Sequence, residues 1–323
     1  MEILLQVLLL VVGFVLLIKG ADFFVEGSGS IARKLQIPDI IVGLTIVAMG
    51  TSAPELAVSV SAALGGSSDI AVGNAVGSNI INILVILGLS AVIVPIIVDK
   101  SMFKRDFPVL LLTAVLLPAI AVVFGNQIGL AAGLIFIAIF ALYIFLTVRA
   151  AIAYRKSGAG DGESKIKILP WWQSILYTIG GAAVIVLGGN LSVEAAKKIA
   201  AACGISEAII GLTVVALGTS LPELVTSVVA AKKGSSDIAL GNIIGSNIFN
   251  VLLILGATAI IKPINVAQTS IIDMLILLGI TVYLFIICVT TKKINRIAGA
   301  SFLALYVAYA TYLFLSMPPQ PVA

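Results

Sequence analysis

Two glutamates, Glu55 and Glu223, lie within long apolar runs of this 323-residue chain. A charged side chain in the centre of a membrane span costs roughly 2.5–3.5 kcal/mol on insertion scales. Each glutamate ends the same six-residue motif, GTSAPE at 50–55 and GTSLPE at 218–223. Because this cost is incurred twice, at equivalent places, the two carboxylates are expected to meet and to hold a positive charge.

The two motifs belong to a longer internal repeat. When 42–88 is aligned with 210–256, 32 of the 47 positions are identical. The repeat includes a second polar segment after each glutamate, GNAVGSNIIN at 73–82 and GNIIGSNIFN at 241–250. Each copy therefore offers two neighbouring apolar segments that carry hydroxyl, amide and carboxylate groups.

The first motif is expected to interrupt its helix. Pro54 has no N–H, so the helical hydrogen bond to the carbonyl of Gly50 cannot form. The sequence predicts a kink or break here that frees the carbonyls of residues 48–50. Thr51 and Ser52 lie four and three residues before Glu55, so both can share its helical face. The second copy repeats this pattern with Ala216, Gly218, Thr219, Ser220, Pro222 and Glu223.

The second polar segments add further oxygen ligands. Ser78 and Asn82 are four residues apart on one helical face, and Ser246 and Asn250 repeat them. Hard cations such as Ca²⁺ take six to eight oxygen ligands. The chain has no histidine and only two cysteines, which disfavours softer metals. Two carboxylates can balance one Ca²⁺ or two monovalent ions, and this is a natural basis for antiport.

The composition indicates a polytopic membrane protein. Hydrophobic residues make up 60% and charged residues 11% of the chain, and the mean hydropathy is +1.21. Spans of about 20 apolar residues are expected ten times. They are predicted at 3–26, 39–64, 70–94, 107–124, 128–149, 173–196, 208–231, 238–261, 270–290 and 297–316. No basic segment precedes the first, which is interpreted as a retained span and not a signal peptide.

Basic residues are sorted between the connections. The odd-numbered connections hold 15 of the 19 Lys and Arg residues, so they are expected in the cytoplasm, with both termini outside. This sorting explains the pI near 9.0 without a nucleic-acid partner. Five spans per repeat would give the two halves opposite topology. The expected units are a first repeat at 1–150, a cytoplasmic linker at 151–172 and a second repeat at 173–323.

At these motifs the chain resembles the cation/Ca²⁺ exchanger superfamily, most closely the prokaryotic Na⁺/Ca²⁺ exchangers. The repeats of that family carry G-[TS]-S-x-P-[ED] on one helix and G-[SN]-x-x-x-[ND] on the next. Here these correspond to 50–55 with 77–82, and to 218–223 with 245–250. The resemblance implies an all-α fold of ten transmembrane helices in two inverted five-helix repeats. It also implies alternating access in which the first and sixth spans slide over the other eight.

The resemblance further implies a role for each motif residue. Both glutamates would bind Ca²⁺ directly and be shared with Na⁺, while the other residues would supply hydroxyl, amide or carbonyl oxygens. These other residues are Thr51, Thr219, Ser52, Ser220, Ser78, Ser246, Asn82, Asn250, Ala48 and Ala216. Ca²⁺ and Na⁺ would be the substrates, and no cofactor is expected. The expected location is the plasma membrane, with the lipid bilayer but no obligate protein as partner.

Three other functions remain open from the sequence. A carboxylate can also bind a proton, so H⁺/Ca²⁺ antiport is the main alternative. A cation channel could use the same oxygens, although channels need weak multi-site binding and an open path. An intramembrane enzyme with two carboxylates as acid and base ranks last, because no nucleophile–base set is evident. Outside the motifs, Asp106 is interpreted as a solvated charge and Asp273 as an interfacial one.

Overall fold

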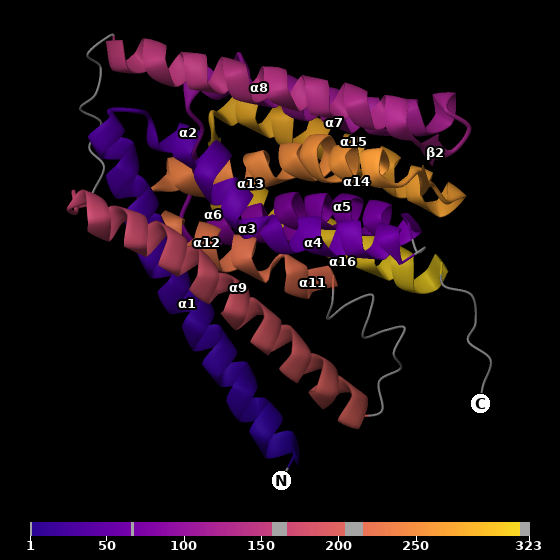
Figure 1. Cartoon of the computed structure of the whole chain (residues 1–323), viewed down its shortest axis with the longest axis horizontal. Coiled ribbons are helices and arrows are strands. Elements are labelled where there is room, and N and C mark those ends of the chain that lie inside the picture. The colour runs from indigo at the N-terminus through magenta and orange to yellow at the C-terminus, as the bar shows by residue number, and fades with distance from the viewer. Residues whose placement is uncertain (1, 66–67, 157–166, 204–215, 317–323) are drawn as a thin grey trace.

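The protein is a bundle of long helices. The computed structural model describes residues 2–65, 68–156, 167–203 and 216–316. Within these ranges, eight helices are long and apolar enough to cross a membrane, and a bent pair at 39–51 and 53–64 would make a ninth span. Figure 1 shows most of them side by side, with α1 and α9 leaning away from the rest. The chain is therefore a helical polytopic membrane protein.

Six of the spans are uninterrupted helices. They are α1 (Glu2–Leu35), α7 (Asp106–Val123), α8 (Leu130–Lys156), α9 (Trp171–Ala202), α15 (Gln268–Thr291) and α16 (Arg296–Ser316). The other spans are built from shorter pieces, and these pieces contain the motif residues.

The interrupted spans contain breaks or π-helical turns. In the first repeat they are α2 (Asp39–Val42), η1 (Gly43–Val47), α3 (Ala48–Thr51) and α4 (Ala53–Leu64), then α5 (Ser68–Ile81), η2 (Asn82–Leu87) and α6 (Gly88–Ile93). In the second they are α11 (Ala216–Thr219) and α12 (Leu221–Lys232), then α13 (Ser236–Phe249), η5 (Asn250–Leu255) and α14 (Gly256–Ile261). Wider π turns occur frequently at functional sites.

Most span boundaries lie near their predicted positions. The clearest difference is α1, which was expected to end near 26 but continues to Leu35. This polar end packs closely on α9, where a Cβ added at Gly27 would lie 2.6 Å from the backbone nitrogen of Thr178 and Ser30 Oγ lies 2.9 Å from Ser174 Oγ. The seventh predicted span, 208–231, begins in residues 204–215, outside the described ranges. Residues 157–166 of the linker predicted at 151–172 also lie outside the described ranges, while α8 extends to Lys156 and α9 begins at Trp171.

Helices α1 and α9 form a closely packed antiparallel pair. A Cβ added at Gly20 would lie 2.8 Å from the backbone nitrogen of Ile185, and one added at Gly188 would lie 2.7 Å from the carbonyl of Gly13. Small residues at such contacts let helix backbones approach closely in a membrane. The pair lies side by side in Figure 1, and it contacts the other helices through α12 and, to a similar extent, through α2, η1, α3 and α11.

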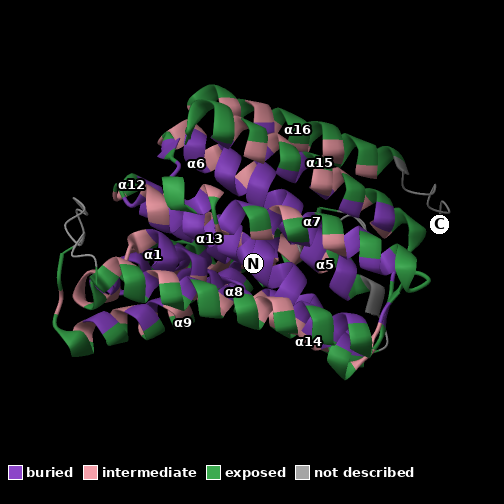
Figure 2. Ribbon diagram, turned by 90° about the horizontal axis from the view of Figure 1, so that it is seen from above, coloured by how far each residue is buried: buried purple, intermediate pink, exposed green. Residues whose placement is uncertain are grey.

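The most buried helices are α5 and α13, at the centre of the bundle (Figure 2). Helix α13 packs against α2, η1 and α3 of the other repeat, with two glycines at the closest contacts. A Cβ at Gly241 would lie 2.7 Å from the carbonyl of Ile40, and one at Gly245 would lie 2.7 Å from the Cβ of Ala48. This contact joins the second polar segment of one repeat to the first motif of the other.

Four two-residue strands connect the halves at the helix ends. β1 (Ile96–Ile97) pairs with β4 (Lys293–Ile294), and β2 (Gln127–Ile128) pairs with β3 (Ile264–Asn265), both antiparallel. Between β1 and α7 lies a short 3₁₀ turn, η3 (Lys100–Phe103). Each pair joins one segment of the first repeat to one of the second.

The interpretation of Asp106 as a solvated charge is wrong. Its side chain is fully buried, pairs with Arg105 at 2.8 Å and accepts a hydrogen bond from Tyr143 on α8 at 3.2 Å. In the second repeat, Asp273 on α15 accepts a hydrogen bond from Tyr309 on α16, also at 3.2 Å. Both aspartates therefore tie neighbouring spans together, a role that the sequence around them did not indicate.

Candidate cation site

Both glutamates follow a helix break, as the prolines predict. Helix α3 ends at Thr51 and α4 begins at Ala53, with a bend of 46° between the two parts. Helix α11 ends at Thr219 and α12 begins at Leu221. Ser52 and Ser220 occupy the two breaks with nearly the same backbone angles, φ −84° and ψ 6° against φ −90° and ψ 4°. Each glutamate thus lies in the first turn of the second half-helix.

The break frees fewer carbonyls than expected. The carbonyl of Ala48 still accepts a hydrogen bond from the backbone nitrogen of Ser52 at 3.0 Å. The reason is that the upstream helix completes its last turn before the chain changes direction. The carbonyl of Gly50 loses its helical donor, because Pro54 has no N–H. The carbonyl of Ala216 begins α11, and the residues just before it lie outside the described ranges.

The two glutamates are buried carboxylates without basic partners. Both side chains are 1% exposed, and Ser52, three residues before Glu55 in the chain, contacts Glu223 Oε1 at 2.9 Å. Within the described part of the chain, neither forms an ion pair, and Oε2 of each has no hydrogen-bond donor. Buried charges are normally paired or bound to a metal. Two adjacent carboxylates with unpaired oxygens therefore indicate a place for a cation.

The hydroxyls of one repeat contact the polar groups of the other. Ser52 Oγ lies 2.9 Å from Glu223 Oε1 and 2.9 Å from Ser246 Oγ. Ser220 Oγ lies 3.3 Å from Ser78 Oγ. Because a hydroxyl has one proton and two lone pairs, Ser52 can donate to the carboxylate and accept from Ser246. The repeats thus build a single cluster in which each motif faces the second polar segment of the other.

Asn82 and Asn250 add a matched pair of amides. They begin the π turns η2 and η5, so both lie where the helix widens. Both are 1% exposed, and Oδ1 of each has no donor among the described residues. The amide of Asn250 donates to Oδ1 of Asn79 at 3.0 Å, which turns its own oxygen away from that neighbour. Each repeat thus leaves one carboxylate oxygen and one amide oxygen unpaired.

Two asparagines outside the predicted site orient the glutamates. Asn74 Nδ2 donates to the backbone carbonyl of Glu55 at 3.3 Å and to Ser59 Oγ at 3.0 Å. Asn242 Nδ2 donates to the carbonyl of Glu223 at 3.5 Å and to Ser227 Oγ at 2.9 Å. The signal for them was present in the sequence, since both belong to the duplicated segments. Only the structure shows that their side-chain amides are hydrogen-bonded to the glutamate backbone and to serine hydroxyls.

Further contacts hold the two second segments together. Asn79 Nδ2 donates to the backbone carbonyl of Asn247 at 3.1 Å, across the two repeats, and Thr51 Oγ1 donates to Asn242 Oδ1 at 3.0 Å. Asn247 instead bonds its own helix through the carbonyl of Ile243. The oxygens of Glu55, Glu223, Asn82 and Asn250 stay unpaired, and Asn247 Oδ1 likewise has no donor among the described residues.

The structure brings most of the predicted ligands together in the described part of the chain. Nine of them are joined by the contacts above or lie buried beside them: Glu55, Glu223, Thr51, Ser52, Ser220, Ser78, Ser246, Asn82 and Asn250. Thr219 lies at the end of α11 and is partly buried. Every side-chain atom of these residues that could coordinate a cation is an oxygen, the ligand that Ca²⁺ and other hard cations prefer.

The chain matches one protein family over most of its length. The family model described as "Sodium/calcium exchanger protein" matches residues 5–149 and 173–315. These two segments correspond to the two halves of the chain, and the break between them falls on the predicted linker.

Several known proteins are similar over nearly their whole length. The putative antiporter CaxA of Alkalimonas amylolytica is 40% identical, covering 94% of this chain and 97% of the relative. The sodium/calcium exchanger MaX1 of Methanosarcina acetivorans is 34% identical, covering 95% and 98%. A solved structure of the sodium-calcium exchanger NCX_Mj superposes with a TM-score of 0.84 and 35% identity, covering 96% of this chain and 99% of that one.

Proposed function

The chain belongs to the sodium/calcium exchanger protein family, and on this basis we propose that it is a secondary active antiporter that exchanges Na⁺ for Ca²⁺. The chain covers nearly all of an exchanger relative, MaX1, and of the exchanger structure NCX_Mj. Members of this family are transporters, and the sequence offers no nucleophile–base set for an enzyme. Exchange of Ca²⁺ for Na⁺ is therefore the activity proposed for the cation site.

One observation carries this proposal. Glu55 and Glu223 are both buried, and each leaves one carboxylate oxygen without a donor among the described residues. Two negative charges match one Ca²⁺ or two Na⁺ at the same place, so the ions would compete for the cluster. Competition of this kind couples the two fluxes when the site changes sides only while it is occupied, because one ion must then return for the other to leave.

We assign the ligands from the geometry of the cluster. Glu55 and Glu223 would bind Ca²⁺ and share their oxygens with Na⁺, and Asn82 and Asn250 would add amide oxygens. The flanking Na⁺ positions would use oxygens of Thr51, Thr219, Ser52, Ser220, Ser78 and Ser246, with the carbonyls of Ala48 and Ala216. The hydroxyls that now bond one another would turn their lone pairs to the cations.

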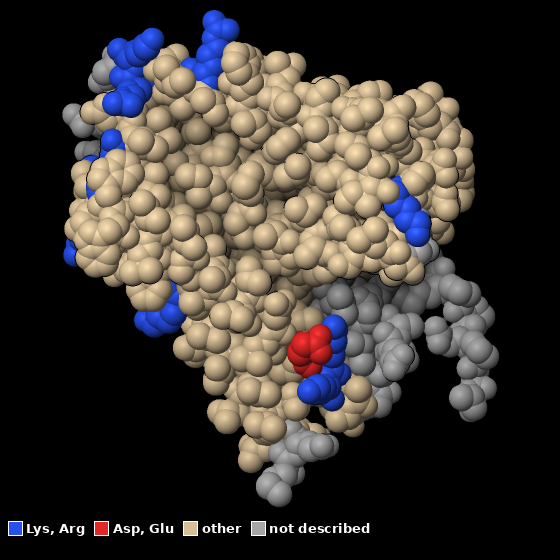
Figure 3. Space-filling model, in the orientation of Figure 1, with Lys and Arg blue, Asp and Glu red and all other residues tan. Residues whose placement is uncertain are grey.

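The proposed topology is ten spans in two inverted repeats, with both termini outside. Nine spans fit the described ranges, and α12 would complete the tenth with residues before 216. The strand pairing supports inversion: β1 and β3 occupy equivalent places in the two repeats, yet β1 pairs with β4 and β3 with β2. Lys and Arg gather toward one end of the face in Figure 3, which fits a plasma-membrane protein with a basic cytoplasmic side.

Helices α1 and α9 would move as one unit during transport. Their backbones are in close contact at several glycines, whereas their fewer contacts with the remaining helices are divided between α12, which carries Glu223, and the segments α2, η1, α3 and α11. Sliding of this pair would expose the glutamates to one side of the membrane at a time. Alternating access would then need no change inside the cation cluster itself.

The experiment is Ca²⁺ uptake by proteoliposomes loaded with Na⁺, with K⁺ or with a proton gradient. Na⁺/Ca²⁺ exchange predicts uptake only with internal Na⁺. Uptake driven only by protons would instead establish the H⁺/Ca²⁺ alternative. Uptake under every internal condition would indicate a channel and overturn the antiporter proposal.

A further inference from the structure

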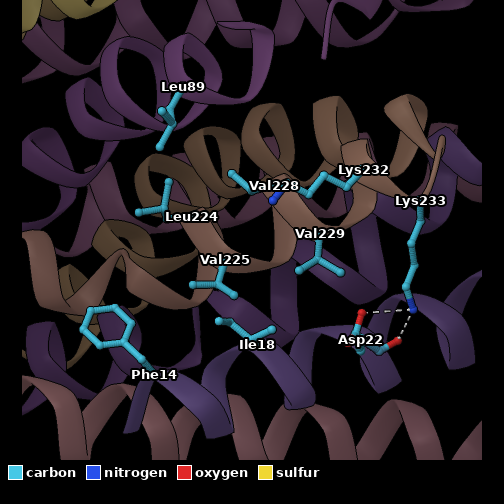
Figure 4. Close-up of a pocket in the computed structure, with 10 residues that line it drawn as sticks. All are labelled: Phe14, Ile18, Asp22, Leu89, Leu224, Val225, Val228, Val229, Lys232 and Lys233. Atoms are coloured by element: carbon cyan, nitrogen blue, oxygen red, sulfur yellow. Dashed lines mark hydrogen bonds and ion pairs between the residues drawn. The ribbon is translucent and has the colours of Figure 1, made fainter. Parts of the chain in front are cut away.

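An apolar groove runs between α1 and α12 beside the cation site. It encloses about 430 Å³. One wall comes from Phe14 and Ile18 of α1, which are four residues apart on one helical face. The facing wall comes from α12 and the floor from α6, through Leu89, Leu224, Val225, Val228 and Val229 (Figure 4).

The groove has the length and direction of one membrane leaflet. It starts at Leu224, next to Glu223 of the cation site, and ends at Lys232. Eight residues of helix rise about 12 Å, close to half of the roughly 30 Å hydrocarbon thickness of a bilayer. The groove therefore reaches from the level of the cation site to one membrane surface, where the basic odd-numbered connections lie.

The surface end of the groove carries two lysines, Lys232 and Lys233, and only Lys233 forms ion pairs among the described residues. Lys233 lies 3.3 Å from the carboxylate of Asp22 and 3.8 Å from that of Glu26, and donates to the carbonyl of Asp22. In Figure 4, dashed lines join Lys233 to Asp22, and none reaches Lys232. Among the described residues, Lys232 has no acidic partner and is exposed. One positive charge at the groove mouth is thus available to a ligand.

The basic mouth is not part of the internal repeat. The positions that match Lys232 and Lys233 in the first repeat are Leu64 and Gly65. The flanking residues on both sides are duplicated, from the GTS-x-PE motif to the GSSD segment. The two lysines therefore add a feature to one half that the symmetric cation cluster does not require.

We propose that this groove binds one acyl chain of an anionic phospholipid, with the headgroup phosphate at Lys232. The apolar walls suit a hydrocarbon chain, and basic pockets between membrane helices on the cytoplasmic side suit anionic headgroups. A neutral lipid would fill the groove but leave the lysine without a counter-charge. The proposal concerns lipid binding alone and does not depend on which ion is transported.

The test is native mass spectrometry of the delipidated full-length protein with phosphatidylglycerol or phosphatidylcholine. We expect one phosphatidylglycerol to be retained at concentrations at which phosphatidylcholine is lost. Lys232→Gln should weaken phosphatidylglycerol binding about fivefold, the effect of one lysine near an anionic surface, and leave phosphatidylcholine unchanged. Val228→Trp should block the groove and weaken both lipids.

Two matched variants control for charge and for bulk. Lys104→Gln removes another exposed lysine from an odd-numbered connection, and Val115→Trp adds a tryptophan on the outer face of α7, where Val115 is 50% exposed. Both should bind phosphatidylglycerol like the wild type. Equal binding of the two lipids, or unchanged binding by Lys232→Gln, would overturn the proposal. So would a dimer of the chain that Val228→Trp dissociates, since the groove would then hold a second copy.

Discussion

The two repeats leave the same oxygens unpaired at the cation site and differ in the residues around them. Glu55 and Glu223 each leave Oε2 unpaired, and Asn82 and Asn250 each leave Oδ1 unpaired, within the described chain. Outside this cluster the halves diverge. Duplication is therefore retained where the same chemistry is needed twice, and it is lost where a residue only anchors a helix or meets the surface.

The buried aspartates illustrate the divergence. Asp106 and Asp273 both accept a hydrogen bond from a tyrosine of the next helix at 3.2 Å. Asp106 is fully buried and also pairs with Arg105, whereas Asp273 is partly buried and forms no ion pair in the described ranges. The shared bond holds two helices together in both halves. Only Asp106 in the first half adds an ion pair, whereas the Asp273 carboxylate in the second half is partly exposed to solvent.

The largest effect is expected where the halves are identical. Glu55→Gln and Glu223→Gln should each reduce Ca²⁺ exchange by more than about 100-fold, since a carboxylate in contact with a divalent cation contributes more than about 2.7 kcal/mol even at an effective dielectric near 20. Uptake by proteoliposomes measures this. Glu194→Gln is the control, because Glu194 is exposed and pairs with Lys197. Retained exchange in either site variant would mean that the halves do not share the cation.

The next effect separates the two aspartates. Asp106→Asn should lower the free energy of unfolding by about 3 kcal/mol, because it leaves Arg105 without its charge partner. Asp273→Asn should cost about 1 kcal/mol, the value of one ordinary hydrogen bond. Thermal unfolding in detergent compares the two. Equal losses would show that the charge pair adds nothing to the bond from tyrosine.

A smaller effect should distinguish the serines at the helix breaks. Ser52 contacts the carboxylate of Glu223 at 2.9 Å, and Ser220 contacts the hydroxyl of Ser78 at 3.3 Å. Hydrogen bonds to charged groups contribute about 1.5–3 kcal/mol and neutral ones about 0.5–1.5 kcal/mol. Ser52→Ala should therefore reduce Ca²⁺ affinity more than Ser220→Ala does. Titration of each purified variant with Ca²⁺ gives the order, and the reverse order would contradict this asymmetry.

The smallest effect is expected at the surface. Lys233→Gln removes partly exposed ion pairs to Asp22 and Glu26, and such pairs contribute less than about 1 kcal/mol. Its counterpart in the first repeat is Gly65, so the first repeat has no lysine at this place. Unfolding of Lys233→Gln, Asp22→Asn and the double variant gives the coupling energy. A coupling energy well above about 1 kcal/mol would contradict this prediction and show that the ion pair stabilises the packing of α1 on α12.

The sequence predicted the site better than its surroundings. The break before each glutamate followed from Pro54 and Pro222, because proline removes a hydrogen bond whatever the tertiary fold. That both repeats contribute side chains to one cluster followed from the duplication. Local chemistry and duplication were sufficient for these features.

The features that sequence analysis missed depend on contacts between distant residues. Asp106 follows Lys104 and Arg105, so it resembled a solvated charge, and only packing against Tyr143 buries it. The carbonyl of Ala48 remains hydrogen-bonded because the chain bends one residue after Thr51. The π turns at Asn82 and Asn250 have no local signal comparable to proline. Neither does the extension of α1 to Leu35, which depends on α9.

The most direct test of the central claim is the number of Ca²⁺ ions bound by the purified protein, measured with and without Na⁺. If both repeats build one site, the wild type binds one Ca²⁺ that Na⁺ displaces, and Glu55→Gln and Glu223→Gln each abolish binding. Two Ca²⁺ ions per chain, with one surviving in each single variant, would mean that each repeat holds its own ion and would contradict the account.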